Sequence, residues 1–298
     1  MLTEKHSKQI LRGKVLRTYN SLYNVLEDNT KQIIICHKQK KVKNVVVGDN
    51  VKYEQLADTG NIISIEDRNN CLLKPVVSNI DQVFVMVSAK YPAISYYQID
   101  SFLTFFNDAT VNPIILFNKM DLVDADYKNT TKHYESLGYE CYWICAEKLS
   151  DKMHEFILTK VAGKTVVFAG HSGVGKSTLI KKLFPEADIL IGDISERLQR
   201  GKQTTKQTSL YYIKETNSFL ADTPGFSQVD ISVFPKEEIK NKFFEFQTYS
   251  DQCRFNNCNH LKEPNCAIKE ALADKKIHQS RYDSYCKMIE QVDKYKKR

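Results

Sequence analysis

Residues 10–66 form short segments rich in β-branched and other apolar residues, broken by Gly, Asn and Asp and without helical periodicity. The pattern predicts five strands, at residues 10–19, 21–28, 31–38, 49–56 and 59–67. Five short strands in so short a segment are typical of a small closed barrel. We favour the OB-fold, the commonest such barrel that binds RNA, and an SH3-like barrel is the alternative.

From residue 80 onward, buried apolar segments alternate with helical ones, which is typical of a parallel α/β sheet. Strands are predicted at residues 81–88, 112–119, 139–145, 164–170, 209–214 and 217–224. After about residue 231 the pattern is helical and is interrupted by a cluster of Cys and His. The sequence therefore predicts a multidomain fold: an N-terminal β-barrel (OB-fold) at 1–68, an α/β domain at 69–230 and a mostly α-helical domain at 231–298. The segment 68–79, with a proline and several polar residues, is interpreted as a linker.

Charge is unevenly spread over the 298 residues, whose formal net charge is +7. Residues 1–68 carry 12 basic and 8 acidic residues, and residues 231–298 carry 14 and 10. Such basic flanks are as compatible with an ordinary solvated surface as with contact to a polyanion. No apolar run approaches the ~20 residues of a membrane span, and residues 1–10 lack the apolar core of a signal peptide. We therefore expect a cytoplasmic protein with no membrane contact, whose eight cysteines are thiols or metal ligands.

Residues 170–178, GHSGVGKST, follow a predicted strand and match the G-x-x-x-x-G-K-[ST] motif. Backbone N–H groups of this loop hold phosphates, and its glycines allow close backbone approach. We expect Lys176 to reach the β- and γ-phosphates and Ser177 to ligate Mg²⁺. A chance glycine-rich turn is the alternative, which the strand-to-helix context disfavours. The predicted phosphate-binding residues are Gly170, His171, Ser172, Gly173, Val174, Gly175, Lys176, Ser177 and Thr178.

The motif NKMD, from Asn118 through Lys119 and Met120 to Asp121, closes the predicted strand at 112–119. Asp121 can accept hydrogen bonds from guanine N1–H and the 2-amino group, donors that adenine lacks. Asn118 can reach the base and tie this loop to the phosphate loop, while the stem of Lys119 can stack along the base. A polar strand exit is the alternative for four residues alone, but beside a phosphate loop they favour guanine.

A third motif, DTPGF at 222–226, ends the last predicted strand of the sheet. Asp222 is expected to hold Mg²⁺ through water, and the Gly225 N–H to follow the γ-phosphate. The polar, basic segment 193–209 precedes it and is predicted to be a switch loop rather than a plain connector. Thr204 or Thr205 would supply a second Mg²⁺ hydroxyl, and we favour Thr205.

The order of these motifs is unusual. They run from NKMD through Cys145 and Ala146 to the phosphate loop, the threonine segment and DTPG, which is one cyclic shift of the Ras-like series. Such a shift preserves a site that depends only on positions around the switch point of a sheet. With its barrel and Cys/His segment, the chain resembles, over essentially its whole length, the circularly permuted GTPases of the RsgA (YjeQ) family.

The Cys/His cluster consists of Cys253, Cys258, His260 and Cys266, spaced C-x₄-C-x-H-x₅-C. Three thiolates and one imidazole suit a closed, tetrahedral, structural Zn²⁺ site. The spacing differs from the common C-x₂-C knuckle, so incidental thiols and a surface His are the alternative. The resemblance to the family's metal segment implies one zinc ion.

The resemblance also implies the function. It implies a GTP hydrolase that uses Mg²⁺, binds GTP and GDP, docks on the small ribosomal subunit through rRNA, and acts late in its assembly. The subunit would stimulate hydrolysis, which would drive release. We expect a monomer. The alternatives are a nucleotide-gated rRNA-binding module with incidental hydrolysis and, from another class, a P-loop ATPase or kinase, which Asp121 disfavours.

Lys176, Thr205 and Gly225 are expected to take part in catalysis, but none of them is an obvious group to orient the attacking water. Phe226 follows the DTPG glycine, where Ras-like enzymes carry a water-orienting Gln. The family usually has a His in the RGKQTT segment thought to serve that role, and here the position is Gln203. Its amide can still hold a water, so we expect an active GTPase that is slow alone.

Overall fold

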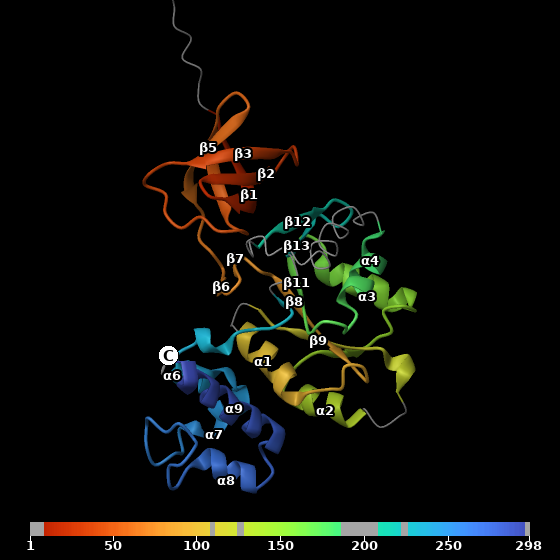
Figure 1. Cartoon of the computed structure of the whole chain (residues 1–298), viewed down its shortest axis with the longest axis vertical. Coiled ribbons are helices and arrows are strands. Elements are labelled where there is room, and N and C mark those ends of the chain that lie inside the picture. Colours follow the sequence, from red (N-terminus) through yellow and green to blue (C-terminus); the bar gives the residue numbers. More distant parts are fainter. Residues whose placement is uncertain (1–8, 108–110, 124–127, 186–207, 222–225, 296–298) are drawn as a thin grey trace, which may run out of the picture. The chain divides into compact units, whose positions relative to one another are not determined.

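The computed structural model describes residues 9–107, 111–123, 128–185, 208–221 and 226–295 (Figure 1). Its first element is a closed barrel of β1 (Ile10–Tyr19), β2 (Leu22–Glu27), β3 (Ile33–Lys38), β4 (Asn50–Gln55) and β5 (Thr59–Ile65). The strand order is β1-β2-β3-β5-β4, and only the β3–β5 pairing is parallel. This is the five-stranded Greek-key arrangement of an OB-fold, as predicted. Val15, Val25, Val51 and Tyr53 fill its interior and are fully buried.

The predicted α/β sheet is also present. It contains β8 (Gln82–Ser88), β9 (Ile114–Asn118), β10 (Cys141–Trp143), β11 (Thr165–Ala169), β12 (Leu210–Ile213) and β13 (Ser218–Ala221), in the order β10-β9-β8-β11-β13-β12. The pairings β8–β9, β9–β10 and β11–β13 are parallel, whereas β12 pairs with β13 antiparallel. The turn at 214–217 is too short for a crossover, so β12 forms an antiparallel edge that the predicted parallel sheet did not include.

Helices complete the described part. Those in the GTPase-motif region are α1 (Tyr96–Phe106), α2 (Lys128–Ser136), α3 (Asp151–Val161) and α4 (Lys176–Leu183). The C-terminal ones are α6 (Lys236–Ile239), α7 (Phe244–Ser250), α8 (Ala267–Ala273) and α9 (Gln279–Tyr295), drawn in blue in Figure 1. Single 3₁₀ turns lie at Met120–Leu122, Ile231–Val233 and Lys240–Lys242. The C-terminal part is therefore mostly helical, as its pattern predicts.

The chain divides into two compact units. The first consists of residues 1–82, 156–167 and 186–225, and the second of residues 83–155, 168–185 and 226–298. The second unit therefore contains both α1 and α9, which contact each other.

Arg281 of α9 fixes the contact between α1 and α9. Its guanidinium is 1% exposed and lies 2.6 Å from Asp100 Oδ1 on α1 and 2.7 Å from Glu245 Oε1 on α7. The Phe243 ring stacks beneath the guanidinium, with 4.4 Å from Cζ to the ring centroid. A buried cation with two carboxylate partners tolerates little displacement, so these three helices keep one arrangement.

The predicted linker is more ordered than its composition suggests. Residues Cys71–Leu73 (β6) and Val76–Ser78 (β7) pair as a two-stranded antiparallel hairpin. Asn70 and Asn79 bracket this hairpin: the Asn79 N–H donates to the Asn70 carbonyl, 3.0 Å away. The proline and the polar residues that indicated a linker therefore belong to a hairpin instead.

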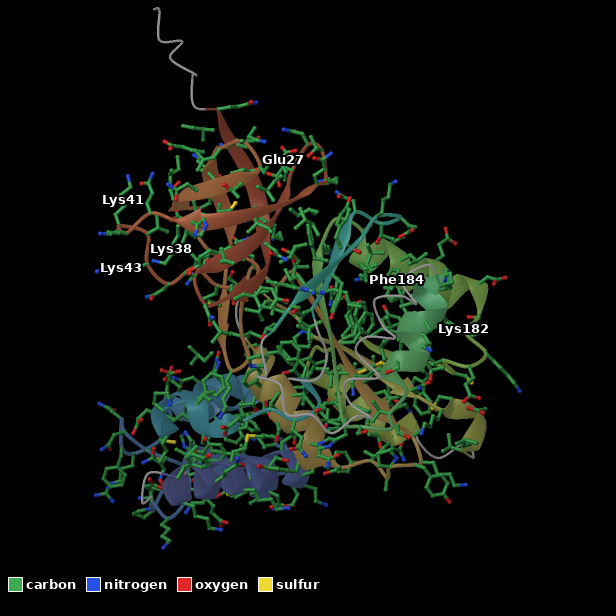
Figure 2. The ribbon with its side chains drawn as sticks, turned by 45° about the horizontal axis from the view of Figure 1, so that its top comes forward. Glu27, Lys38, Lys41, Lys43, Lys182 and Phe184 are labelled. Atoms are coloured by element: carbon green, nitrogen blue, oxygen red, sulfur yellow. The ribbon has the colours of Figure 1, made fainter. Side chains whose placement is uncertain are left out.

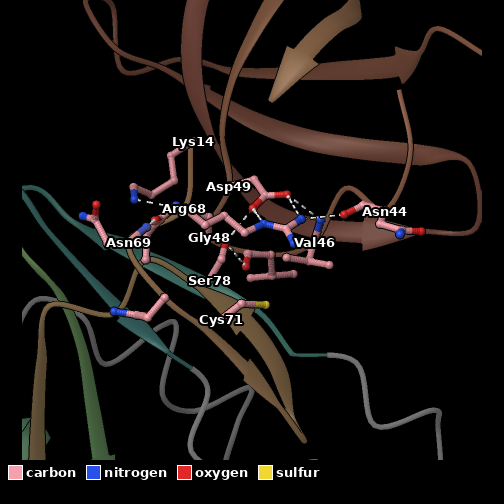
Figure 3. A network of polar contacts seen from close by, with 12 residues as sticks. Lys14, Asn44, Val46, Gly48, Asp49, Arg68, Asn69, Cys71 and Ser78 are labelled. Carbon is pink, nitrogen blue, oxygen red and sulfur yellow. Dashed lines mark hydrogen bonds and ion pairs between the residues drawn. The ribbon is translucent and has the colours of Figure 1, made fainter. Parts of the chain in front are cut away.

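A carboxylate buried in the barrel binds this hairpin (Figure 3). Asp49 is fully buried and accepts hydrogen bonds from Arg68 Nε at 2.7 Å and from Arg68 Nη2 at 2.8 Å. The Ser78 hydroxyl donates to it at 2.7 Å and the Val46 N–H at 2.8 Å. With its oxygens satisfied in this way, the carboxylate attaches both ends of the 68–79 segment to the barrel.

We predict that Arg68→Met lowers the free energy of unfolding by about 2–3 kcal/mol, because it leaves the buried Asp49 carboxylate without its cation. Chemical denaturation followed by circular dichroism measures this change. Arg12→Met is the matched control: Arg12 forms a 3.5 Å ion pair with Glu66 but is 63% exposed, so its loss should cost under about 1 kcal/mol. Equal losses in the two variants would contradict the role given to Asp49.

Candidate nucleotide and metal sites

The phosphate loop lies between β11, which ends at Ala169, and α4, which begins at Lys176. This is the strand–loop–helix context that the motif requires. Gly170, Gly173 and Gly175 all have positive φ, at 141°, 80° and 103°. A Cβ at Gly175 would collide with the side-chain amide of Asn118, and one at Gly170 with the Met86 carbonyl. Glycine is therefore required at both positions for steric as well as conformational reasons.

Lys176, at the start of α4, points back across the loop. Its Nζ donates to the carbonyls of Gly170 and His171, the latter at 2.9 Å. Burial lowers the pKa of Lys176 to about 8. Ser177 is exposed, so its hydroxyl is open to a ligand at the N-terminal turn of α4.

Asn118, the last residue of β9, connects three loops. Its side chain is 2% exposed; Nδ2 donates to the Val174 carbonyl at 2.8 Å, and Oδ1 accepts from the Ala146 N–H at 2.8 Å. The bond to Val174 connects NKMD to the phosphate loop, as predicted. The bond from Ala146 connects NKMD to the loop of Cys145 and Ala146, so the side-chain amide of Asn118 contacts both of the other predicted segments.

The other three residues of NKMD follow Asn118 directly. Lys119 has a left-handed backbone with φ of 63°, and its Nζ donates to the Tyr91 carbonyl. Met120 is half-buried. Asp121 is exposed, and its Oδ1 accepts a hydrogen bond from the Cys145 thiol at 3.3 Å. The carboxylate is thus oriented but open to a ligand, as a base-recognising group must be.

Phe226 ends the DTPGF motif, and its side chain is fully buried. Its ring lies 5.8 Å from that of Phe106, centroid to centroid, and its carbonyl accepts from the Gly170 N–H at 3.0 Å. The ring is therefore part of the core and does not contact water. The other predicted members of the switch segments, Gln203, Thr204, Thr205, Asp222 and Gly225, lie outside the described residues.

The Cys/His cluster converges as its spacing suggested. The ligand atoms of Cys253, Cys258, His260 and Cys266 all lie within 4.8 Å of one another. His260 Nδ1 is 3.6 Å from Cys253 Sγ and 3.5 Å from Cys266 Sγ, so Nδ1 is the nitrogen that faces the thiols. Burial lowers the pKa of His260 to about 4, which keeps the imidazole neutral, as a metal ligand must be. These four residues could hold a metal ion.

Comparison with known proteins decides the family. The model of the RsgA GTPase family matches residues 61–232. This chain belongs to that family. The small ribosomal subunit biogenesis GTPase RsgA of Clostridium botulinum (strain Langeland) is 35% identical over 94% of this chain and 97% of its own length. RsgA of Bacillus velezensis is 35% identical over 96% and 99%. Membership of this GTPase family implies GTP hydrolysis.

Solved structures agree with the fold. YloQ, described as a circularly permuted GTPase, has a TM-score of 0.76 and 30% identity and covers 99% of both chains. YjeQ from Thermotoga maritima has a TM-score of 0.78 and 31% identity over 95% of this chain and 99% of its own. The family's barrel, GTPase domain and helical Cys/His region are all present here. Across the described segments, none of the helices is long and apolar enough to cross a membrane.

One contact at the site was not predicted. Tyr91, whose carbonyl accepts a hydrogen bond from Lys119 Nζ, lies in the loop after β8, to which the sequence pattern assigns no function. Its only local signal is a Tyr-Pro pair after a buried strand, which indicates a turn and nothing about a ligand.

We predict that affinity for GDP falls as pH rises above 8. The Lys176 ammonium is expected to contact the phosphates of a bound nucleotide. A group whose pKa is about 8 loses its proton in that range, so the dissociation constant should rise by up to about tenfold per pH unit. Titration calorimetry between pH 7 and 9 measures this. In Lys176→Arg the cation stays charged, and titration of the base itself affects both proteins equally. A profile for the parent no steeper than that of Lys176→Arg would contradict the prediction.

Proposed function

We propose that this GTPase binds the small ribosomal subunit in a nucleotide-dependent manner and acts late in its assembly. The convergence of NKMD, the phosphate loop and residues 145–146 on Asn118 carries the nucleotide part of the proposal. The names of the relatives, small ribosomal subunit biogenesis GTPase, support the subunit part. The protein would work as a cytoplasmic monomer, with the three domains at 1–68, 69–230 and 231–298.

Guanine recognition is assigned to Asp121. Its exposed carboxylate, oriented by the Cys145 thiol, would accept from guanine N1–H and the 2-amino group. Adenine would leave the carboxylate unpaired in the occupied pocket, which costs a few kcal/mol, on the order of 1–3. Asn118 holds the loop in place, and the stem of Lys119 would lie along the base.

Hydrolysis is an in-line attack of water on the γ-phosphate. Lys176 and the N–H groups of residues 170–178 would stabilise the charge that develops on the phosphate oxygens. Ser177, Thr205 and Asp222 would hold Mg²⁺, which supplies further charge neutralisation when bound; the exposed Ser177 hydroxyl at the start of α4 fits that role. The Gly225 N–H would sense the γ-phosphate.

Positioning of the attacking water is assigned to Gln203. Phe226, at the place of the usual Gln, is buried against Phe106, so its side chain cannot orient a water. We infer that turnover with Gln203 in this role is slow and that the ribosomal subunit stimulates it.

The Cys₃His cluster is assigned to a single structural zinc ion. Three thiolates and a neutral imidazole are the donor set that Zn²⁺ prefers, and four protein ligands leave no open position for catalysis. The Tyr282 hydroxyl donates to the His260 carbonyl at 2.7 Å, which connects the cluster to α9.

Contact with rRNA is assigned to the barrel. Lys41 and Lys43 project from it beside Lys38 (Figure 2), within the segment Lys38–Lys43 that also contains Lys40. Lysines grouped on one loop favour a phosphate backbone, and an OB-fold is a common frame for such contacts.

Co-sedimentation with small ribosomal subunits tests the proposal. The protein loaded with a non-hydrolysable GTP analogue should pellet with subunits at least about tenfold more strongly than the GDP form. Lys41→Glu/Lys43→Glu should weaken this binding and reduce its salt dependence, because phosphate contacts release counterions. Lys132→Glu/Lys152→Glu, exposed on α2 and α3, is the charge-matched control. Equal pelleting with both nucleotides would overturn nucleotide-dependent docking, and an unaffected Lys41→Glu/Lys43→Glu variant would exclude the barrel loop.

One zinc ion per chain should survive gel filtration. Cys258→Ser should lose the ion together with the fold of the surrounding residues, because the buried thiolate is one of four ligands. Metal analysis by mass spectrometry gives the stoichiometry. Cys71→Ser, at an exposed cysteine of the 68–79 hairpin, should keep the ion. A protein that is folded and free of zinc would refute the assignment.

A further inference from the structure

The loop between β8 and α1 is fixed beside the nucleotide motifs by three contacts. The Tyr91 carbonyl accepts hydrogen bonds from the Ser88 hydroxyl at 2.7 Å and from Lys119 Nζ. The Ala89 N–H donates to the Asn118 carbonyl at 2.9 Å. The backbone of Tyr91 is therefore held at the tip of the lysine whose stem is assigned to the base.

The same loop reaches the phosphate loop. Pro92 Cδ lies 4.0 Å from the point where a Cβ on Gly173 would stand, which is ordinary van der Waals distance. Residues 88–92 therefore contact Asn118 and Lys119 of the base-recognition motif and approach the phosphate loop at Gly173.

The Tyr91 side chain has no place in the core. It is 66% exposed, the highest value among the exposed large apolar side chains in the described ranges. One side of the ring is within cation–π reach of Lys90, with Nζ 5.7 Å from the centroid. An exposed ring on a backbone anchored this firmly is a surface prepared for contact, because little further ordering entropy is lost when a ligand packs on it.

We propose that Tyr91 packs its ring against the ribose of the bound guanine nucleotide. The inference rests on the proposed roles of NKMD and the phosphate loop, since the ribose is the part of the nucleotide that joins base to phosphates. Tyr91 contacts Lys119 and the next residue, Pro92, lies beside Gly173, so the backbone of Tyr91 stands between the base-recognition and phosphate-binding residues that the sugar would join. The contact is apolar packing of the ring, so it requires an aromatic side chain and does not require the phenolic hydroxyl.

The test compares GDP with an acyclic-sugar analogue, in which an open chain joins guanine to the diphosphate. Tyr91→Ala should weaken GDP binding about fivefold, the size of one aromatic packing contact. It should leave affinity for the acyclic analogue nearly unchanged, because the ribose ring is missing. Tyr91→Phe should behave as the parent, and so should Tyr295→Ala, which removes an aromatic side chain that is 58% exposed near the end of α9.

Each outcome of this titration calorimetry supports or overturns the contact between Tyr91 and the ribose. Equal weakening for GDP and the analogue would show that Tyr91 acts only through the shape of the loop, which overturns the ribose contact. Unchanged GDP affinity in Tyr91→Ala would overturn it as well. If the parent itself bound no guanine nucleotide, the proposed site would fail along with it, whereas normal binding by the parent confines any failure to Tyr91.

Discussion

The candidate nucleotide site depends on the two hydrogen bonds made by the side-chain amide of Asn118. This amide is buried at the end of β9, and both its donor and its acceptor ends are used, toward Val174 and Ala146. Removing it would leave a carbonyl and an N–H unpaired inside the protein, at a cost of about 1–3 kcal/mol each. The close approach that these bonds need explains why residue 175 is glycine. The two hydrogen bonds of Asn118 join loops that are close in space. They form whichever loop comes first in the chain, so circular permutation preserves the site.

Arg281 imposes a second constraint. With Asp100 and Glu245 it binds α9 and α7 to α1, inside the same compact unit as NKMD and the phosphate loop. Buried ion pairs contribute little net stability but strongly penalise other arrangements, because each charge would be left without a partner. Arg281 therefore binds the helices around the Cys/His cluster to α1 of the same compact unit.

Burial also sets the chemistry of single groups at the site. It lowers the pKa of Lys176 to about 8, because the ammonium is removed from water. It takes Phe226 into the core and away from water. Phe226, the one residue of DTPGF that the structure describes, therefore offers no group that could orient a water.

The sequence alone determined the barrel strands, the nucleotide motifs and the cysteine cluster, because each is a local pattern. Phosphate and guanine contacts need several backbone or side-chain groups in a row, and the four Cys/His residues lie within 14 positions. Tertiary structure decided the antiparallel edge at β12, the attachment of Ser78 to Asp49, the contact of Lys119 with Tyr91, and the pairing of Arg281 with Asp100. Except in the β12 edge, the partners are separated by 28 to 181 residues. No local periodicity or spacing encodes these long-range contacts. Those of Asp49 and Arg281 arise because a buried charged group must find a partner wherever the fold brings one.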